Sequence, residues 1–551
     1  MRRRLWILPI FVIGCSSKIT ETSGQGGAAN SGAGGSSTAG ASSSGASNVN
    51  GGNASTSGGN ASASGGNASA NGGNASANGG NPSANGGNPS ASGGTQNARG
   101  GAANGGSMSS AGGMAPGSNG GAATGTGGQT SGGGSGGGST GATSGPLIDR
   151  ISTTSVTLPS GVKAGVRNYR VWGSVNLKVA PLYTAPLANC GTLVCITTGT
   201  AAAPNARVVR LDASDQLKDV LDLGAGVECR GLAAEPDGHF AALLWNGSDD
   251  TISVRRYDSA GAMLFSTPLV NSDNKPTDFG IGESRLEYGA GKYGAYYHVH
   301  SDSGHEGDTL KYVAAETGAE TTTWGWGCSH SMSNLLTFNP ASSSFLPTCV
   351  TDCYPGTSGS DFATTAIGGV YLNNRTKVID VDAGCNGDVA GELGGAAVAP
   401  SGWKITFNAH QAAASKGQSS YDKSTMNQDI GFASIASATM PGKVVWLTNT
   451  QSVNEADSAI VRWEPAGDSA EQYVVGWSEN SVYKLGRLDP NGTFLEAAVD
   501  ISAKAKWGQR DDPFRQHYNK DVVWAWFDAA GSTTLRFARL RSGGTATCAS
   551  F

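Results

Sequence analysis

Four of the seven histidines lie between positions 298 and 330, in the segments YYHVHSDSGHEGDTL and WGWGCSHSMSNL. His298 and His300 are two residues apart on an expected strand, so their side chains share one face. His305 and Asp308 fall in the turn expected after that strand, and His330 begins the next structural unit. Imidazole and carboxylate groups that converge could hold zinc or manganese, or serve as acid and base.

Two hypotheses follow from this histidine cluster. In the catalytic hypothesis, His305 and His330 are acid and base, and Asp308 orients one of them or binds a metal. In the metal hypothesis, the ligands are His298, His300 and His305. The alternative is structural: the strand histidines merely interrupt the strand, and the turn residues cap backbone amides, as short polar side chains commonly do.

A second run, with the pattern D-x-D-x-x-x-N-x-D, could wrap calcium with carboxylate and amide oxygens. It consists of Asp380, Asp382, Asn386 and Asp388. It is not an EF-hand, because Cys385 stands where the sharp turn needs glycine and Gly391 stands where a bidentate Glu belongs. A polar surface loop is the alternative. The folded part contains no Gly-x-Ser-x-Gly nucleophile motif.

The nine cysteines indicate the compartment. One of them, Cys15, belongs to the N-terminal signal. The other eight form an even set, which in an exported protein predicts up to four disulfides. They are Cys190, Cys195, Cys229, Cys328, Cys349, Cys353, Cys385 and Cys548. The sequence neighbours Cys190/Cys195 and Cys349/Cys353 are near enough to close tight loops, whereas the paired CxxC spacings of a zinc site are absent.

The N-terminus carries a cluster of three arginines and then an apolar run from Leu5 to Ile13, which is too short to span a bilayer. This run ends in Val12-Ile13-Gly14-Cys15, which resembles the bacterial lipobox. The resemblance implies that residues 1–14 are a lipoprotein signal peptide and that Cys15 carries the lipid anchor. Because Ser16 follows instead of Asp, the resemblance further implies sorting to the outer membrane. We expect the folded part to be exposed at the cell surface.

A low-complexity stretch, residues 15–145, separates this anchor from the folded part. From Thr22 to Ile148 there is no aromatic residue, and Arg99 is the only charged one. Such a composition cannot bury a core, so we expect a disordered tether with an r.m.s. span of roughly 60 Å. Asn-x-Ser triplets recur there every seven residues, without the apolar positions that a coiled coil needs.

Residues 146–551 consist of short runs rich in Val, Ile, Tyr, Trp and Thr, broken by Gly, Asp, Asn and Pro. This is typical of strands and turns. Pairs of apolar strands flank polar turns, as in GLAAEPDGHFAALLW, RLEYGAGKYGAYYHVH, GGAAVAPSGWKITFNAHQ and PFRQHYNKDVVWAWFD. Three weaker copies lie near Cys190, Pro340 and Gly467. Several of these pairs are followed by a second strand pair.

Four strands per repeat of roughly fifty residues is the pattern of a β-propeller. We therefore predict an all-β, seven-bladed β-propeller, with a strand from residues 148–180 completing the last blade. A pair of β-sandwiches is the alternative. Six tryptophans could provide inter-blade packing or a surface on which sugars stack: Trp324, Trp326, Trp403, Trp507, Trp524 and Trp526.

Two turns, Asp302-Ser303-Gly304 and Asp528-Ala529-Ala530-Gly531, loosely resemble the Asp-box hairpin of sialidase-like propellers. The Trp that follows an Asp-box is missing, so no sialidase residues carry over. Lipobox, tether and cysteine-bearing propeller together resemble surface lipoproteins of the myxobacterial type, which implies no particular activity.

The formal net charge of −5, without long runs of one sign, argues against a nucleic-acid partner. The sequence shows no complete set of catalytic residues, and a long tether would hold the folded part away from the membrane. We therefore interpret the protein as a surface binding or adhesion module for a polysaccharide or protein ligand, rather than as an enzyme. A carbohydrate-active enzyme, hydrolase or lyase, and a structural envelope protein remain alternatives. A divalent metal is the one cofactor that the motifs suggest.

Overall fold

The computed structural model describes most of the region after the predicted tether. The described ranges are 142–165, 181–249, 251–269, 284–300, 306–324, 334–351, 365–371, 374–381, 391–409, 411, 427–436, 444–453, 455–508, 514–544 and 547–550. The predicted signal peptide, Cys15 and most of the tether lie outside them. Within these ranges, no helix has the length and apolar character that crossing a membrane requires.

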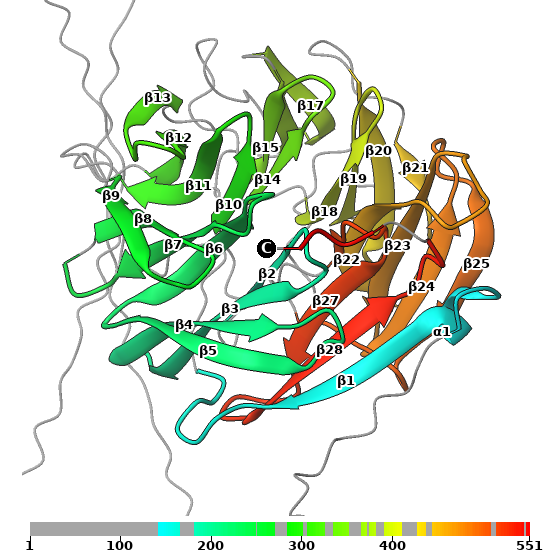
Figure 1. The fold of residues 1–551 in the computed structure, drawn as a ribbon. Coiled ribbons are helices and arrows are strands. Elements are labelled where there is room, and N and C mark those ends of the chain that lie inside the picture. The colour runs from blue at the N-terminus through cyan, green and yellow to red at the C-terminus, as the bar shows by residue number, and fades with distance from the viewer. Residues whose placement is uncertain are drawn as a thin grey trace, which may run out of the picture. The chain divides into compact units, whose positions relative to one another are not determined.

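The described strands form seven four-stranded antiparallel sheets, arranged around a common axis as a β-propeller (Figure 1). In six sheets the four strands follow one another both in sequence and in space. The helical content of the described residues is one short helix, α1 (Leu147–Arg150). The prediction of an all-β propeller is thus confirmed, and the β-sandwich alternative is wrong.

Each sheet has a first strand nearest the propeller axis and a fourth strand at its outer edge. The first strands surround the axis: β2 (Tyr183–Pro186), β6 (Glu228–Ala234), β10 (Ser284–Gly289), β14 (Asn334–Asn339), β18 (Glu392–Ala399), β22 (Glu455–Trp463) and β26 (Arg515–Gln516). The second strands are β3 (Thr192–Thr200), β7 (Phe240–Asn246), β11 (Lys292–His300), β15 (Ser344–Thr351), β19 (Gly402–Ala409), β23 (Gln472–Glu479) and β27 (Val522–Phe527). The third strands are β4 (Ala203–Leu211), β8 (Thr251–Tyr257), β12 (Glu306–Ala314), β16 (Thr365–Tyr371), β20 (Asp429–Ile435), β24 (Val482–Leu488) and β28 (Thr534–Leu540). The fourth strands are β5 (Leu217–Ala225), β9 (Met263–Pro268), β13 (Glu320–Trp324), β17 (Asn374–Val381), β21 (Val445–Trp446), β25 (Phe494–Asp500) and β1 (Ile151–Thr157).

The apolar strand pairs seen in the sequence are the hairpins between first and second strands. The four clear copies are β6–β7, β10–β11, β18–β19 and β26–β27. The three weaker copies are β2–β3, β14–β15 and β22–β23. The polar turns of all these hairpins lie at one end of the propeller, because first strands run in the same direction along its axis.

Burial explains why the strands differ in composition. Second strands pack against a neighbouring sheet on both faces, so β7 and β27 are almost continuously apolar and buried. The outermost strand β25 alternates between exposed and half-buried positions, because only one of its faces is covered.

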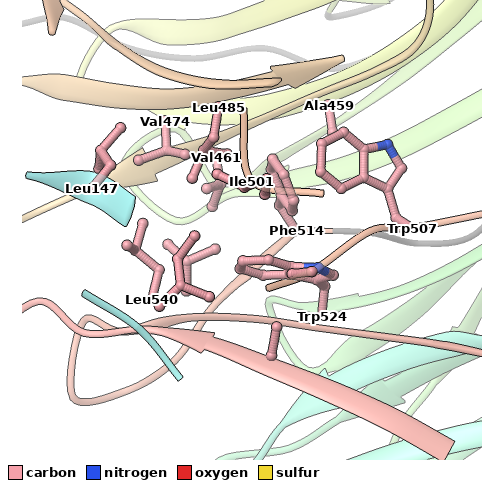
Figure 2. Packing of buried hydrophobic residues seen from close by; sticks show 14 of the residues in the cluster. Leu147, Ala459, Val461, Val474, Leu485, Ile501, Trp507, Phe514, Trp524 and Leu540 are labelled. Atoms are coloured by element: carbon pink, nitrogen blue, oxygen red, sulfur yellow. The ribbon is translucent and has the colours of Figure 1, made fainter. Parts of the chain in front are cut away.

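The ring is closed by the N-terminal strand predicted for this role. Strand β1 pairs with β28 in antiparallel register, from Ile151 opposite Leu540 to Thr157 opposite Thr534. The last sheet therefore contains strands from both ends of the folded region. A hydrophobic cluster fills the space between this sheet and the preceding one, where Phe514 lies between Trp507 and Trp524 with ring centroids 5.1 Å from each (Figure 2).

Polar contacts and a disulfide join the last sheet to the first, in a region we call the ring-closing seam. Arg539 on β28 donates from Nε to Asp215 in the β4–β5 turn at 2.9 Å, and from Nη1 to Asp521 at 3.3 Å. Arg539 and Asp215 are 1% and 3% exposed. The seam is defined by these three residues, by His517 and by the disulfide Cys190–Cys548.

The prediction that the cysteines form disulfides is confirmed, but the suggested pair Cys190/Cys195 is wrong. Cys190 bonds to Cys548 and Cys195 to Cys229, so Cys190 and Cys195 are not partners. The side chains of Cys190 and Cys195 belong to different contacts: one faces the C-terminal segment, and the other faces the second sheet. Cys349 is also disulfide-bonded, while Cys328, Cys353 and Cys385 lie outside the described residues.

Candidate functional site

A cavity of about 630 Å³ opens on the propeller axis at the end that carries the first-to-second-strand hairpins. Every sheet contributes to its wall through its first strand. One lining residue from each is, in chain order, Ala185, Ala233, Glu287, Phe338, Ala397, Arg462 and Gln516. We call this cavity the channel mouth. Its volume lies within the range typical of small-molecule sites, about 300–1,000 Å³.

The aromatic side chains that line the channel mouth include Tyr288, Phe338 and Tyr518, which come from three different sheets. Tyr518 is 43% exposed, which makes it one of few large exposed apolar side chains in the described structure. Burial raises the pKa of Tyr518, and electrostatic interactions with Tyr288 and Glu287 raise it further. The mouth thus offers aromatic faces together with phenolic hydroxyls.

Charged groups stand among these rings. Arg515 Nη1 and Glu287 Oε2 are 3.1 Å apart and join β26 to β10 across the cavity. On the neighbouring rim, Glu464 pairs with Arg462 at 3.2 Å and with Lys520 at 3.1 Å. These side chains are 20% to 41% exposed, so they contact both one another and solvent.

The channel mouth narrows toward the interior. A cavity of about 30 Å³, which we call the floor, shares Thr337, Ala396, Phe514 and Arg515 with the mouth. Arg285, 4% exposed, also lines the floor. This volume accommodates about two water-sized groups.

One histidine lines the described part of the mouth, and backbone groups hold it. His517 Nε2 is 2.9 Å from the Gly191 carbonyl and donates to it, while Nδ1 accepts a hydrogen bond from the Tyr518 amide at 3.1 Å. Burial, with a smaller contribution from Arg539, lowers the pKa of His517 to about 4. The ring is therefore neutral near pH 7 and forms part of the seam.

The structure places His298, His300 and Asp308, the described members of the predicted cluster, away from the channel mouth. His298 is fully buried on β11, opposite Asp308 on β12, and His300 ends the same strand. The prediction that Asp308 lies in a turn is wrong: it is a buried strand residue whose carboxylate accepts a hydrogen bond from Tyr296. Asp308 belongs to a strand because β12 begins to pair with β11 at Glu306, two residues earlier.

Convergence of the catalytic candidates stays a prediction, because His305 and His330 lie outside the described residues. The metal hypothesis also stays a prediction, because its ligand His305 lies outside the described residues. Of the calcium candidates, Asp380 lies on β17 opposite Ala366. Asp382, Asn386 and Asp388 lie outside the described residues.

In the described part of the chain, three side chains with metal-ligand atoms within 4.8 Å occur together once, as Glu235, Asp237 and His239 in the β6–β7 turn. Glu235 is already engaged there: Arg256 binds both of its oxygens, at 2.7 and 3.0 Å, and Tyr293 donates to it. A metal ion would have to displace that guanidinium. The arrangement is better explained as a turn stabilised by ion pairs.

The tryptophans serve packing wherever the structure describes their side chains. Trp403, Trp507, Trp524 and Trp526 are buried within inter-sheet clusters. The side chains of Trp324 and Trp326 lie outside the described part of the chain. The sequence reasoning did not select Tyr518, which is exposed, or Tyr288, which is half-buried.

The repeats carry a signal for these tyrosines. In RLEYGAGKYG and PFRQHYNKDVV, a tyrosine ends the first strand or begins the turn, next to Glu287 or His517. Repeat length indicates the number of sheets, whereas the position of an aromatic residue relative to the turn indicates which end of the ring it reaches. Alignment of the repeats on their turns therefore brings Tyr288 and Tyr518 to one end of the ring.

No protein-family model matches this chain, and no curated protein is similar to it. Several solved structures align with part of it. The BP39L lectin from Burkholderia pseudomallei aligns with a TM-score of 0.41 and 12% identity, over 64% of this chain and 97% of the lectin. The β-propeller domain of the Trilobed protease from Pyrococcus furiosus aligns with a TM-score of 0.36 and 9% identity, over 65% of this chain and 93% of that domain. The soluble aldose sugar dehydrogenase from Escherichia coli aligns with a TM-score of 0.31 and 12% identity, over 57% of this chain and 98% of the enzyme. Alignments at this level assign neither an activity nor a ligand to this chain.

Proposed function

We propose that this protein is a surface-displayed binding module, a seven-bladed propeller whose channel mouth takes a saccharide ligand. The observation that carries the proposal is the cavity of about 630 Å³ on the axis, to which the first strand of every sheet contributes. The seven sheets support the count of seven blades.

The side chains of the mouth support a saccharide. Sugar rings present a face of C–H groups and an edge of hydroxyls, which suit an aromatic face flanked by charged hydrogen-bonding groups. Tyr288, Phe338 and Tyr518 offer such faces, and Glu464 and Lys520 stand beside Tyr518 on the rim.

The hydrogen bonds and the lowered pKa of His517 favour binding over catalysis at the channel mouth. A general base needs a ring nitrogen that can reach a substrate proton. Both ring nitrogens of His517 face backbone groups, and its lowered pKa disfavours protonation at neutral pH. A carbohydrate-active enzyme would have to use residues elsewhere, such as His305 and His330.

We also propose that the module is exported and held at the outer membrane through lipid on Cys15. The lipobox-like end of the signal supports the anchor, and the disulfides Cys190–Cys548 and Cys195–Cys229 support an oxidising compartment. In cell fractionation, Cys15→Ser should move the protein from the membrane to the soluble fraction. Wild-type protein recovered without detergent would contradict the anchor.

The experiment for the binding proposal uses the full chain purified in detergent and a panel of immobilised neutral and acidic polysaccharides. Retention on a polysaccharide, without release of new reducing ends, is the expected result. Tyr288→Ala should lower retention at least tenfold, whereas Leu264→Ala, which removes an exposed apolar side chain from β9, should leave it unchanged.

Cleavage of a retained polysaccharide would favour the enzyme alternative. Failure of every polysaccharide to be retained would refute the saccharide proposal. Equal retention by Tyr288→Ala and wild type would refute the channel mouth as the site.

A further inference from the structure

The channel mouth carries more positive than negative charge. Three cationic side chains line it, Arg462, Arg515 and Lys520, against the two carboxylates Glu287 and Glu464. His517 adds no charge at neutral pH, because its pKa is lowered to about 4. The whole chain has a net charge of −5, so this local excess runs against the overall charge.

The positive charge continues inward. Arg515, whose Nη1 lies 3.1 Å from Glu287 Oε2, lines both the mouth and the floor, and Arg285 lines the floor. No carboxylate is among the described residues that line the floor. A guanidinium has five N–H donors in a planar fork, a geometry that matches the two oxygens of a carboxylate.

The shape of the cavity determines how a chain molecule can enter. The mouth narrows from about 630 Å³ to a floor of about 30 Å³, and the first strands surround it on all sides. An internal stretch of a polymer would have to lie across the rim, out of reach of the floor. A chain end can enter along the axis and place its last ring against the aromatic side chains.

We propose that the channel mouth binds the terminal, carboxylate-bearing sugar of an acidic glycan, end-on. This inference rests on the proposed function and names its ligand class. The terminal ring packs against Tyr288 and Tyr518, and its carboxylate points toward the floor, where Arg515 and Arg285 lie. Lys520 and Arg462 on the rim attract the next acidic unit.

The test uses three matched pairs of soluble trisaccharides: trigalacturonate and galactotriose, trimannuronate and mannotriose, cellotriuronate and cellotriose. Each is titrated into the full-length protein in detergent by calorimetry. We expect at least one acidic member to bind at least tenfold more tightly than its neutral partner. Its affinity should fall when NaCl is raised from 50 to 500 mM, because salt screens exposed charges.

Variants locate the effect. Lys520→Gln should weaken binding of the acidic member about fivefold and leave any binding of the neutral member unchanged, whereas Lys520→Arg should restore the acidic preference. Lys218→Gln removes an exposed lysine from β5, away from the mouth, and serves as the matched control. Capping the non-reducing end of the acidic trisaccharide with a bulky group should abolish binding.

The outcomes separate this inference from the proposed function. Equal affinity for acidic and neutral members would overturn the acidic preference and leave saccharide binding standing. Undiminished binding of the capped trisaccharide would overturn end-on entry. Absence of binding by all six trisaccharides, together with no retention on any polysaccharide, would overturn both proposals.

Discussion

The ring-closing seam and the channel mouth lie at the same end of the propeller and meet at two adjacent residues. His517 is 2% exposed and is fixed by backbone groups, whereas Tyr518 is 43% exposed and lines the mouth. In the seam, Arg539 and its carboxylate partners are almost completely buried. In the mouth, ion pairs are open to solvent. The contrast indicates that the seam is built to hold the ring closed, and that the mouth keeps polar and aromatic groups available for a ligand.

The largest expected effect is the loss of the central charge of the seam. Arg539→Gln leaves Asp215 buried without its cation and leaves Asp521 only the cationic contact with Arg541 at 3.4 Å, which should lower the free energy of unfolding by about 3–5 kcal/mol. Urea denaturation measures this change.

Arg536→Gln is the matched control on the same strand. Arg536 pairs with Asp528 at 2.9 Å, but both side chains are about 40% exposed, so the loss should stay below about 1 kcal/mol. Similar losses for Arg536→Gln and Arg539→Gln would show that burial does not distinguish the seam.

The disulfide of the seam should have the next largest effect. Cys190 and Cys548 are separated by 358 residues, so their bond restricts the unfolded chain over almost the whole folded region. Replacing both residues by Ala should cost about 2–4 kcal/mol in thermal or urea unfolding. Each single Cys→Ala variant should match the double variant. An unchanged unfolding midpoint would mean that pairing of β1 with β28 alone keeps the ring closed.

Much of the fold could be predicted from the sequence, because burial on one or both faces leaves a pattern in each strand. Repeat length and the alternation of apolar strands with polar turns predicted the hairpin of GLAAEPDGHFAALLW. They also predicted that an N-terminal strand, β1, completes the last sheet. Disulfide pairing could not be predicted, since Cys190 and Cys548 approach only when the ring closes. The mouth was missed because its residues come from every sheet, and the tyrosines at its turns come together only when the repeats are aligned. Asp308 was misplaced because strand β12 begins earlier than the polar sequence around it indicates.

Acidification should weaken the seam through His517. Its pKa is about 4 in the folded protein against 6.5 for an ordinary histidine, so the unfolded chain binds the proton more readily. The stabilising contribution is present above pH 6.5 and is lost as the pH falls toward 4, by about 2 kcal/mol between pH 7 and 5.

The difference between wild type and His517→Gln isolates this effect. Gln keeps a hydrogen-bond donor but does not titrate, so the stability difference should shrink by about 2 kcal/mol from pH 7 to pH 5. Wild type alone is not sufficient, because burial raises the pKa of Glu455 to about 7 and gives that residue the opposite pH dependence. A difference that stays constant from pH 7 to pH 5 would show that His517 is not held neutral by the fold.

The smallest effect on stability is expected from Tyr518→Ala, the variant that separates ligand binding from folding. Tyr518 is 43% exposed, so its replacement should change the free energy of unfolding by less than about 1 kcal/mol. The measurement is the affinity of this variant for a polysaccharide that wild type retains, with its thermal midpoint recorded in the same preparation. We predict at least tenfold weaker binding at a nearly unchanged midpoint. Wild-type affinity in Tyr518→Ala, or weaker binding accompanied by a large fall in the midpoint, would contradict the assignment of the channel mouth as the ligand site.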